Sequence, residues 1–277
     1  MCKWRYSVST AEEAPISAPI LLQGSVSENL ERAAKLGYDA IELHTREDVC
    51  LDYEDIARRV EETGTCVAMI LTGRLYTQGR CDLIDDRPYI VGAAMDGMRR
   101  YIEIAGRLGA DVVIGWAKGR IPESGNPKQY LDRLAKNLRI LATYASEYGV
   151  KLNIEVINRY EVNFFTTARE VIEFIEEYKL DNCFVHLDTF HMYIDEPDPL
   201  AAIRACKSKL GYVHLADNSR RYPGSGSIDF QKILQILDEI EYKGYLSVEC
   251  FPVPSGEEAA AMAIEHMKKC ERHLRRE

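Results

Sequence analysis

Four apolar segments in the second half of the chain each end in a residue type that binds metal ions. The segments are KLNIEV with Glu155, FVHLD with Asp188, YVHLAD with His214 and LSVECF with Glu249. Three carboxylates and one imidazole form a hard, oxygen-rich donor set that suits Mn²⁺, Mg²⁺ or a similar divalent cation. Such an ion polarises carbonyl and hydroxyl oxygens, so the set indicates metal-assisted chemistry on a small oxygenated substrate.

The spacing of these residues predicts the elements that position them. Successive members are 26 to 35 residues apart, which suits a strand, a loop, a helix and a return loop. Earlier apolar segments predict four more strands, and segments of helical period lie between all of them. The earlier strands are expected at 18–22, 39–44, 66–71 and 111–115. We therefore expect one single-domain (β/α)8 barrel over residues 1–277, with the active site where the strand C-termini converge.

The later strands also predict which way their side chains point. Asn153, His186, Tyr212 and Ser247 each lie two residues before one of the four candidate ligands and so share its side of the strand. The opposite side of each strand is apolar. We expect the polar side to face the barrel interior and the apolar side to face the helices, and we expect His186 to be a core histidine with its hydrogen bonds satisfied.

Glycines and loop lengths add local expectations. A glycine before the next strand is predicted to end each of six helices, at Gly37, Gly64, Gly109, Gly149, Gly211 and Gly244. The segments 72–87 and 216–228 are longer than turns require, so we expect them to overhang the functional face. Asp217 and Asn218 are expected either to hold the second of these loops or simply to cap it.

Composition excludes several classes of protein. The net charge of −9 disfavours nucleic acid as a partner, because the phosphate backbone is repelled. No apolar run approaches the ~20 residues of a membrane helix, and the start, MCKWRYSVSTAEEAP, lacks the apolar region of a secretory signal. We therefore expect a cytoplasmic protein without a membrane partner. The eight cysteines form no CxxC pair and are expected to be reduced thiols.

With these residues in view, the chain resembles the xylose isomerase-like TIM barrels, and within them the ketose 3-epimerases of the D-tagatose/D-psicose type. The resemblance spans nearly the whole chain and is densest from Gly149 to Pro252. It implies one divalent cation, with Mn²⁺ expected and Co²⁺, Mg²⁺ or Zn²⁺ as alternatives. The ligands that it implies are Glu155, Asp188, His214 and Glu249. The substrate-binding residues that it implies are His191 in DTFH, Arg220 in HLADNSR and Glu161 in EVINRYE.

The implied reaction is epimerisation of a ketose at C3 through an enediolate. Glu155 and Glu249 are the expected catalytic pair, one removing a proton and the other returning it to the opposite face. Trp116 is expected to form a substrate-binding wall, with a packed core tryptophan as the alternative. Glu42 is expected to act from behind the ligands, and His44 either lines the pocket or forms a buried pair. A small carbohydrate is the expected substrate, and a homo-dimer or homo-tetramer the expected assembly.

Other functions fit the same residues less well. An aldose–ketose, inosose or sugar-phosphate isomerase would use the same metal site. Arg221 with YPGSG could bind the phosphate group of a sugar phosphate through its guanidinium, with an ordinary loop arginine as the more common alternative. An abasic-site endonuclease of the same barrel type would cluster further metal ligands, but AMILTGR and VVIGWAKG end without any. A non-catalytic sugar-binding barrel would not need two opposed glutamates.

Overall fold

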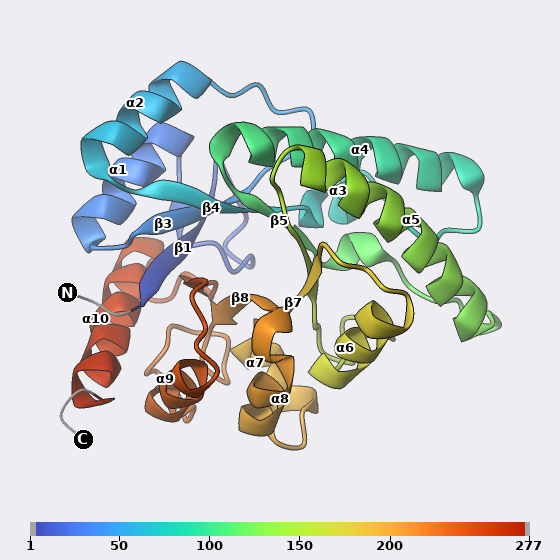
Figure 1. The fold of residues 1–277 in the computed structure, drawn as a ribbon. Coiled ribbons are helices and arrows are strands. Elements are labelled where there is room, and N and C mark those ends of the chain that lie inside the picture. The colour runs from blue at the N-terminus through green and yellow to red at the C-terminus, as the bar shows by residue number, and fades with distance from the viewer. Residues whose placement is uncertain (1–3, 275–277) are drawn as a thin grey trace.

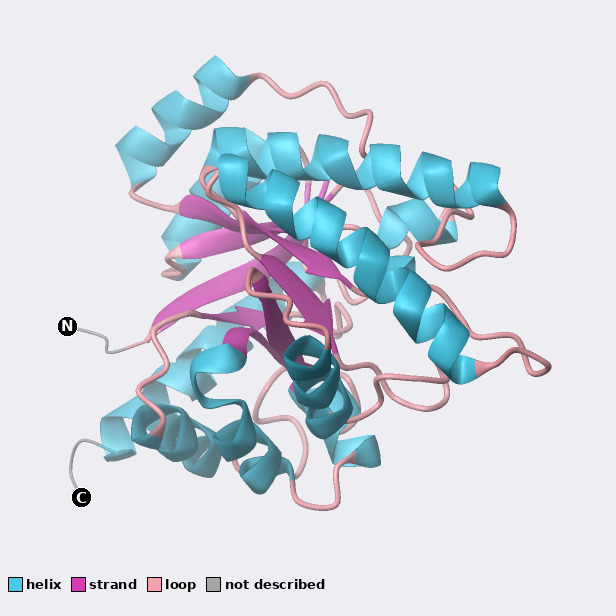
Figure 2. Ribbon diagram, turned by 45° about the vertical axis from the view of Figure 1, so that its right-hand side comes forward, coloured by secondary structure: helices cyan, strands magenta, loops and turns pink. Residues whose placement is uncertain are grey.

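Eight parallel strands enclose the centre of the molecule, and helices surround them (Figures 1 and 2). The structure is a computed structural model that describes residues 4–274. The strands follow the order β1-β3-β4-β5-β6-β7-β8-β9, and pairing between β1 and β9 closes the sheet. The two-residue strand β2 is an addition that pairs with the end of β1. The prediction of a single-domain (β/α)8 barrel is confirmed.

The elements alternate along the chain as a barrel requires. The strands are β1 (Arg5–Ala11), β2 (Leu22–Gln23), β3 (Ala40–His44), β4 (Cys66–Leu71), β5 (Asp111–Ile114), β6 (Leu152–Glu155), β7 (Cys183–Asp188), β8 (Leu210–Leu215) and β9 (Tyr245–Val248). The α-helices are α1 (Val26–Leu36), α2 (Tyr53–Thr63), α3 (Gly73–Thr77), α4 (Pro88–Leu108), α5 (Pro127–Glu147), α6 (Ala168–Glu177), α7 (Thr189–Asp195), α8 (Pro199–Cys206), α9 (Phe230–Glu239) and α10 (Gly256–Leu274). Two short 3₁₀ helices are η1 (Trp116–Lys118) and η2 (Lys207–Lys209).

The prediction for the first strand is wrong. Residues 18–22 lead into β2, and the first barrel strand is β1, which begins before them. The sequence RYSVSTA hides this strand because it contains no continuous apolar run. Ser7 and Ser9 are fully buried, and Ser7 pairs in register with Ser247 of β9. Small polar residues therefore occupy the interior side of β1, where the pattern of an ordinary strand would show apolar ones.

The hydrophobic core lies mainly between the barrel and its helices. The large core cluster contains the apolar side of the strands, such as Ile154, Val185 and Leu215, together with the inner faces of the helices. A much smaller cluster, which includes Met69 and Tyr212, fills the interior of the barrel. Polar side chains complete that interior, so the predicted phase of the strands is confirmed.

Four of the six predicted helix-ending glycines have the expected left-handed backbone. They are Gly37, Gly64, Gly109 and Gly149. Gly211 instead lies inside β8, where a Cβ atom would be 2.0 Å from Oδ1 of Asn153. A Cβ atom on Gly244 would lie 2.1 Å from the hydroxyl oxygen of Tyr242, and α9 ends before it at Glu239, with Ile240 as its cap. At both positions close packing, rather than helix capping, accounts for the glycine.

Two further expectations concern segments outside the barrel. The segment 72–87 contains the short helix α3, and both it and residues 13–20 line the cavity described below.

The seven cysteines among the described residues are free thiols, whereas Cys2 lies outside the described residues. The end of the predicted last helix, at 275–277, also lies outside them. None of the helices in the described part is both long enough and apolar enough to cross a membrane.

Candidate active site

The four candidate ligands meet at the C-terminal ends of four neighbouring strands. Glu155 and Asp188 are the last residues of β6 and β7, His214 is near the end of β8, and Glu249 directly follows β9. Nδ1 of His214 lies 3.5 Å from Oε2 of Glu249 and 3.9 Å from Oε1 of Glu155. Donor atoms of Asp188, His214 and Glu249 lie within 4.8 Å of one another. The structure therefore brings the four predicted side chains together around one point.

Two of the atoms that could bind a metal ion are buried without a hydrogen-bond partner in the described part of the chain. Among the described residues, Nδ1 of His214 and Oδ2 of Asp188 are buried and have no hydrogen-bond partner. Burying such atoms unsatisfied costs free energy, and so does burying several carboxylates together. A divalent cation would satisfy the lone pairs and neutralise the acidic charge. The donor set, one imidazole nitrogen and three carboxylates, fits Mn²⁺ and related cations.

Glu42 of β3 holds His214 from behind. Nε2 of His214 donates to Oε2 of Glu42 at 3.0 Å, and the hydroxyl of Tyr212 donates to the same oxygen at 3.1 Å. In the metal-free protein burial acts to lower the pKa of His214, but the charges of Glu42 and Glu249 outweigh it and raise that pKa well above its ordinary value, so the ring is charged. A cation would replace the proton on Nδ1 and leave the other proton on Nε2, facing Glu42. A carboxylate behind a histidine is the usual means of fixing a metal-binding tautomer and ring orientation.

The two glutamates of the predicted catalytic pair have opposite electrostatic environments. Burial raises the pKa of Glu155 to about 8 in the metal-free protein, with the charge of Glu249 adding to the effect. Burial also acts to raise the pKa of Glu249, but the charge and hydrogen bond of His214 outweigh it and lower that pKa to about 2. Without a cation, Glu249 is therefore ionised at neutral pH, and Glu155 retains a proton.

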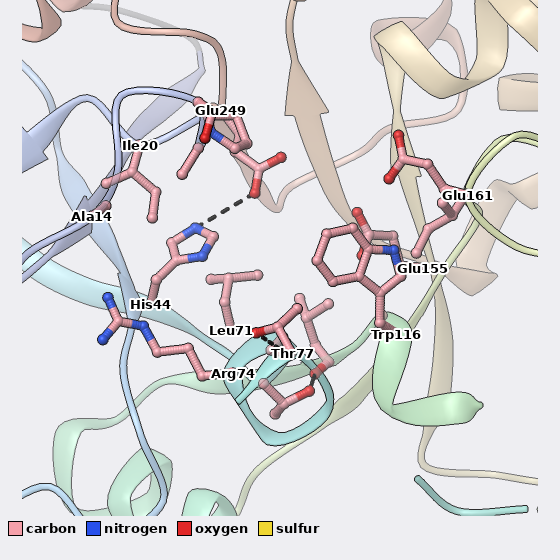
Figure 3. A pocket seen from close by; sticks show the side chains of 18 of the residues that line it. Ala14, Ile20, His44, Leu71, Arg74, Thr77, Trp116, Glu155, Glu161 and Glu249 are labelled. Atoms are coloured by element: carbon pink, nitrogen blue, oxygen red, sulfur yellow. Dashed lines mark hydrogen bonds and ion pairs between the residues drawn. The ribbon is translucent and has the colours of Figure 1, made fainter. Parts of the chain in front are cut away.

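A cavity of about 770 Å³ opens above these residues. Glu155 and Glu249 line it, whereas Asp188 and His214 are fully buried beneath. The four predicted substrate-binding residues all line the same cavity: His191, Arg220, Glu161 and Trp116. Figure 3 shows His44 and Glu249 on one side, with Glu155, Glu161 and Trp116 on the other.

Comparison with known proteins places this site in a family. The model of the family described as xylose isomerase-like TIM barrel matches residues 30–270. The chain belongs to this family. An L-ribulose 3-epimerase from Mesorhizobium japonicum is 32% identical over 232 residues, which cover 83% of this chain and 76% of that relative. An L-ribulose 3-epimerase from Methylomonas sp. is 30% identical over 222 residues, covering 79% of this chain and 76% of the relative.

Solved structures agree with the sequence comparisons. The structure of an L-ribulose 3-epimerase has a TM-score of 0.85 and 27% identity to this chain, covering 99% of this chain and 96% of that one. Because these relatives and a ketose 3-epimerase from Arthrobacter globiformis are epimerases, this member of the family is an enzyme of the isomerase class.

Asn158, which the sequence did not single out, links two of the cavity residues, Glu161 and His191. Asn158 donates through Nδ2 to Oε1 of Glu161 at 3.1 Å and to Nδ1 of His191 at 2.7 Å. Its Oδ1 accepts from the backbone N–H of Tyr160 at 3.0 Å, which fixes the orientation of the amide. Nδ1 of His191 is then the acceptor, so the ring carries its proton on Nε2 and can donate there. Burial, together with Arg220, lowers the pKa of His191 well below its ordinary value, so the ring is neutral.

Arg220 is placed by the loop that follows β8. Asp217 is fully buried, and its two carboxylate oxygens accept from the backbone N–H groups of Asn218, Gly224, Gly226 and Ile228 at 2.8–3.1 Å. Of the two expectations for Asp217, the structure supports the one in which it holds the loop. Arg220 itself has a φ of 56°, and its guanidinium lies 3.2 Å from Glu161 and 3.5 Å from Glu249.

Lys118 is a second feature that sequence reasoning missed. Its side chain is fully buried, and Nζ donates to the carbonyl oxygens of Gly115 and Glu155, both at 3.2 Å. Burial lowers the pKa of Lys118 to about 8 against the opposing charges of Glu155 and Glu161. The ammonium thus ties the end of β6 to η1, which carries Trp116.

Two expectations for histidines are resolved differently. His44 lines the cavity, which supports the first of its two alternatives; its Nε2 lies 3.4 Å from Glu249 and 3.7 Å from Glu42 but makes no hydrogen bond within residues 4–274. The expectation that His186 has satisfied hydrogen bonds is wrong, since within the described chain neither ring nitrogen has a partner. Its ring instead stands edge-on to the ring of His214, with centroids 4.1 Å apart. The strand phase predicted its burial but not its neighbours.

Proposed function

We propose that this enzyme is a divalent-metal-dependent epimerase that inverts C3 of a ketose. The observation that carries the proposal is the placement of Glu155 and Glu249 on opposite sides of one cavity, each within 4 Å of the same imidazole nitrogen. A substrate lying between them would expose one face of its C3 to each carboxyl group. The epimerase relatives support the same reaction class.

The two carboxyl groups divide the work of proton transfer. Inversion needs a base on one face of C3 and an acid on the other, and each proton transfer contributes ~10²–10⁴-fold to the rate. Glu155 and Glu249 lie on opposite sides of the cavity (Figure 3), so one takes the proton from C3 and the other returns a proton, drawn from solvent, to the opposite face. In the reverse direction the two residues exchange roles.

The remaining cavity residues hold the oxygens next to the reacting carbon. His191 donates from Nε2, and Arg220 supplies a permanent cation that packs 5.0 Å from the ring centroid of Phe190. Both groups stabilise negative charge that develops on the carbonyl and hydroxyl oxygens. Glu161 accepts from Asn158 and Arg220 and keeps both of these donors in place. Trp116 forms the wall against which the carbon chain of the substrate packs.

Glu155, Asp188, His214 and Glu249 are the residues that would hold the cation, and we propose Mn²⁺. When bound, the cation supplies positive charge at the carbonyl side of the substrate. Because a cation displaces protons from the groups that bind it, its uptake at neutral pH would release protons from Glu155 and His214, whose pKa values are raised in the metal-free protein.

A chelation experiment tests the proposal. The enzyme is treated with a chelator, and a free ketopentose or ketohexose is then added with and without Mn²⁺. We expect no turnover without the cation and formation of the C3 epimer after its return, separated by chromatography. Full activity after complete chelation would contradict the metal requirement. An aldose as the main product would instead favour the isomerase alternative.

A further inference from the structure

The cavity over the candidate ligands does not end at Trp116. A second cavity of about 640 Å³ adjoins it, and Thr77, Trp116 and Glu161 line both. We call the first the inner cavity and the second the outer cavity. Pockets of roughly 300–1,000 Å³ suit drug-sized ligands, and the inner cavity alone is within that range. A free ketopentose or ketohexose is smaller than such ligands and would leave the outer cavity empty.

The walls of the outer cavity have the chemistry of a carbohydrate site. Tyr76 and Trp116 offer aromatic surfaces, against which the C–H faces of a sugar ring pack. The other walls are charged: Arg80, Asp82, Asp85, Arg87 and Glu161. These alternating donors and acceptors match the hydroxyl groups of a second ring.

The balance of charge favours a neutral occupant over a phosphate. Asp85 accepts both Nε and Nη2 of Arg87 at 2.8 and 2.7 Å, so that guanidinium is already engaged. Arg80 is left as the remaining cation among the lining residues, beside the carboxyl group of Asp82, while Glu161 is paired with Arg220. A doubly charged phosphate would meet one available cation with a carboxyl group beside it, whereas a sugar hydroxyl can both donate to the carboxyl oxygens and accept from Arg80.

We propose that the inner and outer cavities form one continuous site for a glycoside of the keto sugar. The reacting sugar lies between Glu155 and Glu249, and a second sugar residue, attached at the end remote from C3, lies against Tyr76 and Trp116. This inference rests on the proposed ketose epimerase function and specifies its substrate class as a keto-disaccharide rather than a free monosaccharide.

Three substrates that share one reacting sugar test the inference. They are D-fructose, 6-O-α-D-glucosyl-D-fructose and D-fructose 6-phosphate, each incubated with the Mn²⁺-loaded enzyme. We expect kcat/KM for the glucosyl compound to exceed that for fructose by about tenfold or more, since remote contacts raise kcat/KM. The phosphate should be the weaker of the two extended substrates. Equal or better use of free fructose, or a preference for the phosphate, would overturn the proposal.

Variants of Tyr76 locate the effect in the outer cavity. Tyr76 lines only that cavity and is not among the residues packed on the core. Tyr76→Ala should lower kcat/KM for the glucosyl compound about fivefold or more and leave fructose within about twofold, because only the second ring loses an aromatic contact. Tyr76→Phe should retain the wild-type preference. Tyr148→Ala, at an exposed tyrosine that lines neither cavity, is the control and should change neither substrate.

A binding measurement separates failure of the subsite from failure of the epimerase proposal. If none of the three sugars reacts, the epimerase proposal fails, and the subsite is judged by tryptophan fluorescence. The chain has two tryptophans, of which Trp4 is buried and Trp116 borders both cavities. We expect 6-O-α-D-glucosyl-D-fructose to change the emission at lower concentration than fructose does, and Tyr76→Ala to remove that difference. A Tyr76→Ala protein that binds both sugars like the wild type would overturn the subsite.

Discussion

The two halves of the barrel contribute different things to the cavity. Strands β6 to β8 and the residue after β9 provide the four candidate ligands, and the segments that follow these strands provide His191 in α7 and Glu161 and Arg220 in loops. Strands β1 to β5 provide none of these four; β3 supplies Glu42 behind His214, and α3 and η1 supply Arg74, Thr77 and Trp116 along the walls. The proposed proton-transfer groups therefore come from one half of the barrel, while the other half supports the ligands and shapes the cavity.

The largest effect should follow from changing the carboxyl groups of the second half. Glu155→Gln and Glu249→Gln should each lower kcat ~10²–10⁴-fold, because each variant loses one proton-transfer group. His44→Gln, a wall residue of the first half next to Glu249, should cost about tenfold or less. Steady-state kinetics with a free ketose provide the measurement, and Glu265→Gln on the exposed side of α10 is the control. A His44 variant as impaired as Glu155→Gln would break the comparison.

Removing the support behind His214 should weaken the cation site without abolishing it. Glu42→Gln retains an acceptor for Nε2 of His214 but loses the negative charge that makes the imidazole a better ligand. Loss of such a partner typically lowers metal affinity ~10–100-fold. Titration calorimetry with Mn²⁺ measures this, again beside Glu265→Gln. Unchanged affinity in Glu42→Gln and also in Glu42→Ala would show that the first half does not support the ligand.

A change in the loop that carries Arg220 should have a smaller effect on activity than the changes above. Asp217→Asn replaces a carboxylate oxygen that accepts backbone N–H groups with an amide that cannot, so we expect a loss of ~1–3 kcal/mol in the free energy of unfolding. We also expect KM to rise more than kcat falls, because Arg220 is displaced from the substrate oxygens. Urea unfolding and steady-state kinetics measure the two effects. Asp181→Asn, at an exposed position without such contacts, should show neither.

The smallest predicted effect is a pH dependence of the metal-free protein. Glu155 has a folded-state pKa of about 8 against an ordinary value of 4.5, so its neutral form favours the folded state at low pH. That contribution is complete below pH 4.5 and is lost as the pH rises to 8. Burial also raises the pKa of Asp188, to about 6, so its neutral form stabilises the folded state in the same way at lower pH values.

The difference between wild type and Glu155→Gln isolates the contribution of Glu155. Between pH 5.5 and 8 the chelated wild type should lose ~1 kcal/mol or more of unfolding free energy beyond what Glu155→Gln loses, as one pKa unit corresponds to ~1.4 kcal/mol. Denaturant unfolding at a series of pH values measures it. Parallel curves for the two proteins would show that Glu155 is not protonated in the metal-free state.

Sequence reasoning predicted the second half of the barrel better than the first, and the reason is physical. The strands from β6 onward combine a continuous apolar side with a metal-binding residue type at or near the C-terminal end. Both the strand and the candidate ligand can therefore be recognised in the sequence. β1 has small serines on its interior side, so it lacks the apolar run that residues 18–22 show, and the sequence predicts the first strand at 18–22 instead. The barrel and its strand phase did not depend on that error.

The supporting contacts were not predictable because they join distant residues. Asn158 contacts His191, which lies 33 positions after it in the sequence. Lys118 donates to the carbonyl oxygen of Glu155, which lies 37 positions after it. An asparagine in a loop or a lysine in GWAKG gives no sign of such a partner until the strands are placed side by side. The same holds for the outer cavity, whose walls come from α3, the loop after it, η1 and the loop after β6.

The position of a deuterium label tests the central claim most directly. The Mn²⁺-loaded enzyme is incubated with a ketose in D₂O, and the products are examined by NMR. Proton transfer by Glu155 and Glu249 at opposite faces predicts deuterium at C3 together with a new C3 epimer. Deuterium at C1 together with an aldose product would contradict the account and assign the same carboxyl groups to aldose–ketose isomerisation.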